Sequence, residues 1–510
     1  MAISTAVDLT RVSRVVGYKL KSGIFSPVTP YLPQRIAVFA EANTANQATL
    51  DTDPYEFISA KEAADKYGYG SPMHQIARIL RPLSGNPLGG IPTIAYPVEE
   101  AAGATAALHT LGIAVATTVT ENATHKIRIN GRDSIDGISY SFTVTKGQSA
   151  ANVQDSIVDA INNVTASPVV AAEATANVAT TTKWKGETSK ISLEIDTQGK
   201  SAGIVYSEVS NVAGTGTPTV STVLAKIGNK WDTIAINGVG ENHLEAFETF
   251  NGTPDPETPS GRYEPTVFKP LVALFGGVDS DKDDVVLITN ASARKDQVTN
   301  VYCPAPNSKG LEFEAAANMC MTYAPVAQNS PHNDNSGKSY PDMPIPTDEV
   351  IGDFSDYNAR DFMVKKGAST VNIVNGKYTV QDFVTTYAPD GDPLPKFRFV
   401  RDLNIDWNYA FNWIIIMQRD IQDKAIIGDD SPTRVDNTIS PKQGSQLLRS
   451  HIEEMEKLAL IADSEFSINS IQVGINLTNP ARLDFFNRYK RTSVAHVVST
   501  DSEVDFNFNS

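Results

Sequence analysis

Residues 369–387 read STVNIVNGKYTVQDFVTTY, and this stretch decides how the rest of the chain is interpreted. Apolar residues alternate on both sides of Asn375-Gly376, the dipeptide favoured in a tight two-residue turn between antiparallel strands. The pattern therefore predicts a β-hairpin at the centre of a domain. A polar turn broken by prolines follows at 388–395, and nothing in the stretch points to catalysis.

The composition limits the class of protein. A chain of 510 residues is long enough for two or more domains. Its 59 acidic and 43 basic residues give a formal charge of −16, so duplex DNA, which binds through Lys and Arg, is a poor partner. Only Cys303 and Cys320 are present, which favours folding in a reducing cytoplasm without disulfides. No run approaches the ~20 apolar residues of a membrane span, and the first residues lack a signal-peptide pattern.

The first third of the chain predicts an arm followed by alternating strands and helices. Residues 1–30 alternate weakly and then meet several prolines, which indicates an extended arm. A strand is expected at 35–40, and helices at 59–67 and 73–80. Ser59 is the expected N-cap of the first helix, with Glu62 at the capping-box position. This alternation is typical of an α/β domain.

Between 104 and 235 the composition shifts to Ala, Thr, Val and Asn with few charges. The pattern predicts a helix capped by Ser149 and strands at 125–129, 138–144, 169–178 and 191–195. We expect a peripheral β-rich domain inserted into the α/β domain, with its two ends close together.

The remaining elements return to mixed α and β character. We expect a buried strand at 285–288, helices at 310–323, 408–427 and 443–462, a polar loop at 328–346, a strand at 468–477, a short helix or turn at 479–486, and a final strand at 493–508. The predicted organisation is an N-terminal linker arm (1–30), a discontinuous core (31–103 and 236–492), an inserted outer domain (104–235) and a C-terminal linker strand (493–510). The fold class is α+β or α/β.

No motif supports an enzyme. Ser336-Gly337-Lys338-Ser339 resembles the end of a phosphate-binding loop, but position 332 is His where that loop needs glycine. Asp279, Asp281 and Asp283 imitate the start of a calcium loop without its glycine or its bidentate glutamate. The histidines show no metal-ligand spacing. We therefore expect no catalytic, cofactor or metal site.

Several segments resemble contractile phage tail sheath proteins of the Mu-like kind, which are related to tailocin and type VI secretion sheaths. The segments are Phe383-Val384-Thr385-Thr386-Tyr387 before a polar turn, Pro97-Val98 leading into the Ala-rich run to Ala107, and Asn479-Pro480-Ala481-Arg482-Leu483-Asp484 before the final strand. The resemblance implies a core α/β domain around a tail tube and an inserted domain facing outward. It also implies a virion location, with assembly in the host cytoplasm.

The function implied by this resemblance is that of a structural subunit, not an enzyme. Subunits would stack as hexameric rings around the tube, and contraction would drive the tube through the host envelope. The implied partners are other copies of the chain, the tail tube, and baseplate and terminator proteins, without nucleic acid or membrane insertion.

The strand-like arms and the hairpin suggest that neighbouring subunits are linked by strand addition. The candidate linking residues are Val12, Val15, Val16, Val380, Phe383, Val384, Tyr387, Val494, Val497, Val504 and Phe506. Basic residues near the last strand are candidates for facing an acidic tube, although a solvated surface is the simpler interpretation of them; they are Arg482, Arg488, Lys490 and Arg491. A second basic group, Lys396, Arg398 and Arg401, lies near the hairpin.

Two other structural roles stay open. A tube or baseplate component could share the inserted module, and a secreted β-rich adhesin is disfavoured by the missing signal peptide.

Overall fold

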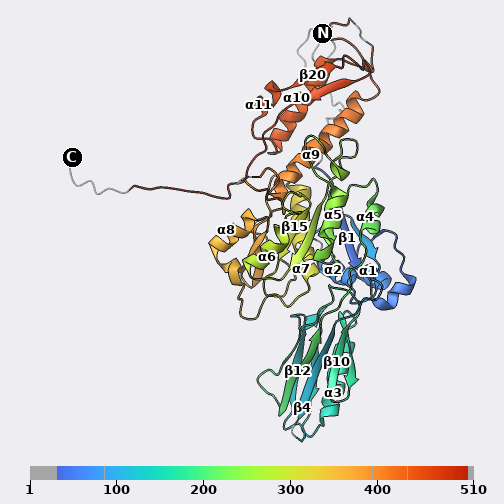
Figure 1. Ribbon diagram of the computed structural model, residues 1–510, viewed down its shortest axis with the longest axis vertical. Coiled ribbons are helices and arrows are strands. Elements are labelled where there is room, and N and C mark those ends of the chain that lie inside the picture. The colour runs from blue at the N-terminus through green and yellow to red at the C-terminus, as the bar shows by residue number, and fades with distance from the viewer. Residues whose placement is uncertain (1–30, 86, 116, 393–394, 433–434, 504–510) are drawn as a thin grey trace, which may run out of the picture.

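The computed structural model describes residues 31–85, 87–115, 117–392, 395–432 and 435–503. Three bodies follow one another along the long axis in Figure 1. The central body, called the core here, carries an inserted module at one end and a distal module at the other. The fold mixes α and β elements, as the sequence predicted.

A six-stranded sheet forms the centre of the core. Its strands lie in the order β15 (Asn300–Pro304), β14 (Val272–Gly277), β13 (Ile234–Asn237), β1 (Ile36–Glu41), β3 (Thr93–Val98) and β2 (Tyr55–Glu56). All neighbouring pairs are parallel except β2 with β3. β1 and β3 are buried along their whole length, which fits a parallel sheet covered on both faces.

Helices cover both faces of this sheet. One face packs against α1 (Ala60–Tyr67), α2 (Pro72–Leu80) and α7 (Glu312–Asn329), and the other against α4 (Ser221–Leu224) and α5 (Leu244–Asn251). α6 (Lys282–Thr289) and α8 (Tyr357–Lys365) pack together beside the sheet. The Ser59 side chain accepts a hydrogen bond from the Glu62 amide, so the predicted N-cap is confirmed.

The central hairpin is present as β16 (Thr370–Val374) and β17 (Lys377–Asp382). Asn375 and Gly376 both have positive φ, at 52° and 70°, as a type I′ turn requires. Val371, Tyr378 and Val380 belong to the hydrophobic core, so the hairpin is built into the central body.

The inserted module consists of two sheets and one helix. The larger sheet has the order β12 (Ile204–Val212), β4 (Leu108–Val115), β10 (Asn177–Thr182) and β9 (Val169–Ala174). The smaller has the order β11 (Leu193–Asp196), β5 (Ala123–Ile129) and β8 (Ser141–Val144), beside a short hairpin of β6 (Ser134–Ile135) and β7 (Ile138–Ser139). α3 (Ala150–Asn162) is capped by Ser149, as predicted, and its apolar side joins a separate hydrophobic cluster.

The segment 220–227 packs with the core, although the sequence placed it in the inserted domain. Val220, Val223, Leu224 and Ile227 lie in the cluster that covers β1, β3 and β13. Trp184, from the middle of the insertion, is fully buried in the main core cluster. The insertion is thus bound to the core by its own return segment.

The distal module is connected to the core by α9 (Val400–Ile416), which ends in a π-helical turn (Met417–Ile421). Trp407 packs in the core cluster, whereas Ile405 and Tyr409 pack with α10 (Pro441–Lys457) in the distal cluster. The module also contains α11 (Ser464–Asn469), the pair β18 (Ala425–Ile426) and β19 (Thr438–Ile439), and the pair β20 (Gln472–Ile475) and β21 (Leu483–Phe486). α9 is therefore a rod shared by two hydrophobic clusters.

Several sequence predictions about local structure are wrong. Residues 285–288 lie in α6 instead of a strand, because Asp281 caps a helix whose first turn is acidic. The predicted strand 468–477 is divided between α11 and β20, and the predicted helix or turn at 479–486 ends in β21. The predicted strand 169–178 is divided by a turn between β9 and β10, and the predicted helix 408–427 begins at Val400 and reaches only Ile416 before the π-helical turn. Residues 493–503 pair with no other described strand of the same chain, and the linker strand stays a prediction.

Candidate interaction surfaces

The two segments that imitate a phosphate-binding loop and a calcium loop have structural roles. Gly337 donates from its backbone N to Val380 O at 2.8 Å, and Val380 N donates to Lys338 O at 2.9 Å, so the serine-rich loop runs beside β17. Asp281 caps α6 by accepting from the Asp283 amide at 2.7 Å. Among the described residues, no three His, Cys, Asp or Glu side chains are grouped to hold a metal ion. No described helix is both long and apolar enough to cross a bilayer.

The inserted module covers the end of β1 at the carboxyl edge of the parallel sheet, the edge where open α/β sheets commonly bind ligands. Chain order reverses at β1 and β13, which makes this the topological switch point. Thr188 from the insertion donates to Glu41 Oε2 at 3.4 Å, at the end of β1. A Cβ on Gly186, where φ is +122°, would lie 2.9 Å from Glu41 Oε1. Glycine therefore allows the return segment to approach the sheet edge.

Several carboxylates lie close together along this edge, and the repulsion between them disfavours their ionised forms. Burial and the nearby carboxylates of Glu100 and Glu187 raise the pKa of Glu41 well above its ordinary value. Burial, Glu312 and Asp279 likewise raise the pKa of Glu241. The seam between insertion and core is therefore sensitive to ionisation.

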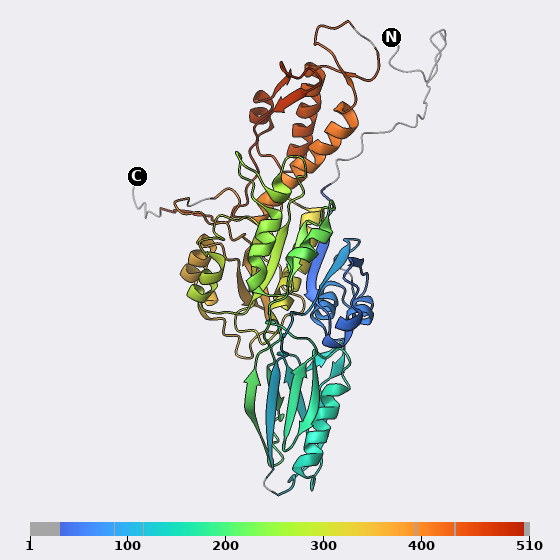
Figure 2. The ribbon, with the colours of Figure 1, turned by 45° about the vertical axis from the view of Figure 1, so that its right-hand side comes forward.

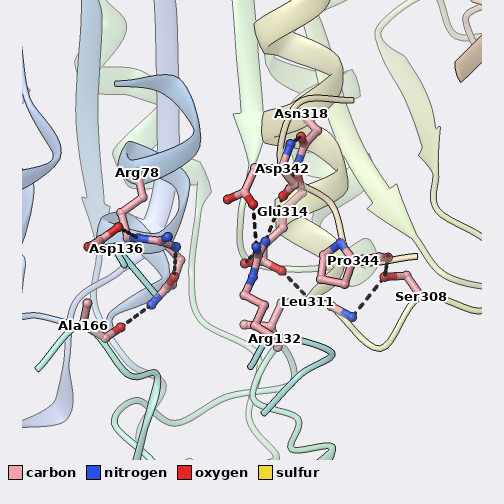
Figure 3. Close-up of polar contacts among 12 residues, drawn as sticks. Arg78, Arg132, Asp136, Ala166, Ser308, Leu311, Glu314, Asn318, Asp342 and Pro344 are labelled. Atoms are coloured by element: carbon pink, nitrogen blue, oxygen red, sulfur yellow. Dashed lines mark hydrogen bonds and ion pairs between the residues drawn. The ribbon is translucent and has the colours of Figure 1, made fainter. Parts of the chain in front are cut away.

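An ion-pair cluster holds the inserted module against the core (Figure 3). Arg132, which follows β5, donates through Nη1 to Asp342 Oδ1 at 2.6 Å and through Nη2 to Glu314 Oε1 at 3.1 Å. Its side chain is 11% exposed and that of Glu314 is 3% exposed. Arg78 on α2 makes a second bridge, from Nε to Asp136 Oδ1 at 2.8 Å. These contacts fix how the inserted module projects from the core.

The central hairpin is less open to an incoming strand than its sequence suggested. The side chains of Val380, Phe383 and Val384 are fully buried, and Tyr387 packs against the core. Tyr340 N donates to Tyr378 O at 2.8 Å, next to the bonds made by Gly337 and Val380, so residues 337–340 already cover the outer edge of β17. A link between subunits through these side chains stays a prediction.

The pair β20 and β21 has open edges instead. In the described residues no other segment donates a backbone hydrogen bond to 472–475 or 483–486 or accepts one from them. Its residues are mostly half-buried against α10, with Phe485 in contact with Trp413 at 5.3 Å between ring centroids. Sequence reasoning missed this pair because the segment was divided into one strand and one helix.

Residues 493–503 leave the body after Thr492, which is the last strongly anchored residue. Arg401 donates to the Thr492 backbone O and Oγ1, both at 2.6 Å. His496 stacks on Phe399 at 4.5 Å, and beyond it the segment runs away from the body in Figures 1 and 2. Val494 is 36% exposed, whereas Val497 and Val498 are 81% and 80% exposed. The candidates Val12, Val15, Val16, Val504 and Phe506 lie outside the described residues.

The predicted basic residues do not form one free patch. Arg491 is an internal partner of Asp406, with Nη2 and Oδ2 2.8 Å apart. Lys490 pairs with Asp463 at 2.8 Å, and Arg482 pairs with Asp484 at 2.5 Å. Arg488 lies over the Phe486 ring at 5.8 Å. Arg398 and Arg401 are buried. Whether any of the four near the last strand faces a tube stays a prediction.

No family model matches this chain, and no curated protein matches it. A crystal structure of a sheath tail protein from Desulfitobacterium hafniense is similar over 94% of this chain and 100% of that chain, with 10% identity and a TM-score of 0.42.

Proposed function

We propose that this chain is a structural subunit of a contractile tail sheath, which polymerises around a tail tube through its C-terminal arm. The observation that carries the proposal is the exposed segment 493–503 together with the open-edged pair β20 and β21. The sequence resemblance of segments 97–107, 383–387 and 479–484 to sheath proteins supports the same function.

The arm has the properties of a strand that lacks its sheet. Val497 and Val498 expose apolar side chains, and burying one valine contributes about 1.5 kcal/mol. A ladder of about five residues adds a few kcal/mol at roughly 1 kcal/mol per net hydrogen bond. One link is therefore weak, but many links along a polymer are strong together. We infer that β20 or β21 of a neighbouring copy accepts the arm by strand addition.

Contraction requires links between neighbouring subunits that persist while the core of each subunit moves. An arm anchored at Thr492 can stay paired with a neighbour while the core rotates, because the residues after His496 have no backbone bonds to their own body among those described. Stacked hexameric rings that shorten and drive the tube through the host envelope are the assembly in which such arms operate. The subunit acts in the virion, after assembly in the host cytoplasm, and its partners are the tube, baseplate and terminator proteins.

The test is electron microscopy of the full chain and of a variant lacking residues 493–510. The full chain should form hollow striated cylinders. The truncated variant should stay folded by circular dichroism but form none. A matched control, Thr500→Ser, leaves the exposed valines in place and should assemble. Normal cylinders from the truncated variant would overturn the proposal.

A further inference from the structure

Four Asn-Gly dipeptides occur in the chain and share one chemical weakness. They begin at Asn130, Asn237, Asn251 and Asn375. When the backbone nitrogen of the glycine attacks the side-chain amide carbon of the asparagine, ammonia leaves and a cyclic imide forms. Glycine favours this reaction because it has no Cβ and lets the backbone rotate. The dipeptide is the same at every site, so the surrounding structure decides which asparagine reacts.

The fold holds three of these asparagines in its interior. Asn130, Asn237 and Asn251 are 4%, 2% and 0% exposed. Asn251 donates through Nδ2 to the backbone O of Leu271 and accepts through Oδ1 from its N, both at 2.9 Å. Asn237 Nδ2 donates to Gly240 O at 2.8 Å. A buried amide that is bonded in this way cannot turn toward the glycine nitrogen without losing its partners.

The attacking nitrogen is also occupied at two of these sites. Gly238 N donates to Phe39 O, and Gly252 N donates to Glu248 O, both at 2.8 Å. The reaction requires this nitrogen to lose its proton and to approach the side-chain carbon. Both hydrogen bonds must therefore break before either site can react.

The turn at Asn375 has none of these protections. Asn375 and Gly376 are exposed between β16 and β17. Within the described part of the chain, the Asn375 side chain makes no hydrogen bond, and Gly376 N donates to no backbone carbonyl. A Cβ on Gly376 would have no atom within 4 Å. The side chain and the nitrogen are therefore free to approach one another.

Asn130 is the most informative comparison, because its turn has nearly the same backbone conformation as 375–376. The φ angles of the asparagine and the glycine are 48° and 76° in the first turn, and 52° and 70° in the second. Asn130 Oδ1, however, accepts from Ser192 N at 2.8 Å. A Cβ on Gly131 would lie only 2.8 Å from Pro344 Cβ. Burial and bonding, and not the backbone angles, distinguish the two turns.

We propose that Asn375 is a site of spontaneous covalent modification and that the fold protects the other three Asn-Gly sites. Gly376 N forms a bond to Asn375 Cγ while the bond from Cγ to Nδ2 breaks, and the proton lost from Gly376 N leaves with the ammonia. Water then opens the imide. Cleavage between Cγ and the Gly376 nitrogen gives aspartate. Cleavage between the backbone carbonyl carbon and that nitrogen gives isoaspartate, in which the main chain passes through Cγ.

The modification falls on the central hairpin. Isoaspartate adds a methylene group to the main chain of the turn and a carboxylate beside it. Val374 and Lys377 are directly paired across this turn, and the length of a turn sets the register of its hairpin. Tyr378 and Val380 belong to the main core cluster. The modified chain should therefore melt at a lower temperature than the unmodified chain. The reaction needs only a single chain, so it does not depend on the proposed polymer.

Ageing of the full chain in mildly alkaline buffer tests the proposal, because base removes the proton from the glycine nitrogen. Mass spectrometry of tryptic peptides measures conversion at each site, and labelling by an isoaspartyl methyltransferase identifies isoaspartate. A buried site reacts only when its segment opens, so Asn375 should convert at least about tenfold faster than Asn130. Asn375→Gln would have to form a larger ring and should show no conversion at this position.

The same chain unfolded in urea is the matched control for the fold. All four sites should convert at similar rates there, because only the shared dipeptide remains. Equal rates at Asn375 and Asn130 in the folded chain would overturn the proposal. A faster rate at Asn375 that persists in urea would also overturn it, since the fold would then not be the cause. Equal melting temperatures of the separated modified and unmodified chains would overturn the inferred effect on the hairpin.

Discussion

Arg132 of the inserted module and Glu314 at the start of α7 form a buried ion pair across the boundary with the core, with Nη2 and Oε1 3.1 Å apart. Glu314 also accepts from the Leu311 amide at 3.0 Å, so its carboxylate both starts the helix and receives the arginine. Burial alone would lower the pKa of Arg132, but Glu314 and Asp342 raise it above its ordinary value. The module is therefore held by a charge that stays ionised.

Arg132→Met should destabilise the chain by about 3 kcal/mol, because it leaves the carboxylate of Glu314 buried without its partner. Denaturant unfolding of the two chains measures this difference. The control is Arg128→Met, whose pair with Asp196 is about one-third exposed and should change stability by less than about 1 kcal/mol. Equal effects of the two substitutions would show that the buried pair has no special role.

Local signals in the sequence predicted much of this fold. Asn375-Gly376, Ser59 and Ser149 each specify a backbone conformation through a few neighbouring atoms, and the structure confirms all three. Short apolar runs were less reliable. Residues 285–288 are four apolar residues that suit a strand or a helix. The Asp281 carboxylate caps the N-terminus of α6 and thereby favours the helix.

The candidate surfaces depend on contacts between residues far apart in sequence. Arg491 looked like a surface charge, but its partner Asp406 is 85 positions away on α9. The cover over β17 comes from residues 337–340, which are separated from the hairpin by α8 and carry no strand pattern of their own. Neither relationship has a local signature, so sequence reasoning missed both.

Glu41→Gln should make stability less dependent on pH. The raised pKa of Glu41 means that the folded chain holds a proton there which the unfolded chain releases near its ordinary value. Stability is therefore complete at low pH and declines as pH rises toward the folded-state pKa. Melting temperatures at about pH 5 and about pH 8 should differ less in Glu41→Gln than in the wild type. Glu56→Gln, at an exposed position, should retain the wild-type difference, and an unchanged slope in Glu41→Gln would contradict the assignment.

His451 should make the distal module sensitive to acid. Burial lowers its pKa to about 4, and its ring lies 4.5 Å from Tyr409 and 5.6 Å from Trp413. The stability contributed by the neutral ring is complete above the unfolded pKa of about 6.5 and is lost as pH falls toward 4, with a total on the order of 3 kcal/mol.

Thermal unfolding followed by tryptophan fluorescence should therefore show a smaller loss on acidification in His451→Phe than in the wild type. Part of the loss should remain, because burial also lowers the pKa of His74 to about 4. His496→Gln, in which an exposed ring is removed from the arm, is the control. Equal acid sensitivity of His451→Phe and the wild type would count against this role.

Arg488→Glu should impair assembly around a tube if the basic residues near β21 face an acidic surface. Lys490→Glu alone would also break the pair with Asp463, so it is combined with Asp463→Lys, which restores an internal pair with the charges exchanged. Charges at the rim of an interface act mainly on the rate of association, and low salt strengthens their effect. The assembly defect should therefore be larger at low salt. Co-assembly with tubes, scored by microscopy, measures it; normal assembly of both variants would remove the tube-facing role.

Val473→Pro should block polymer formation without unfolding the subunit, if β20 accepts the arm of a neighbour. Asn476 N donates to Arg482 O at 2.9 Å, and hydrogen-bonded pairs alternate along an antiparallel ladder. Gly474 therefore bonds to β21, while the amide of Val473 points to the open edge. Proline at 473 removes that outward donor and leaves the internal ladder in place. Val473→Ala loses the same packing but retains the amide, so it should still form cylinders. If Val473→Pro assembles as well as Val473→Ala, the arm does not pair with this edge of the sheet.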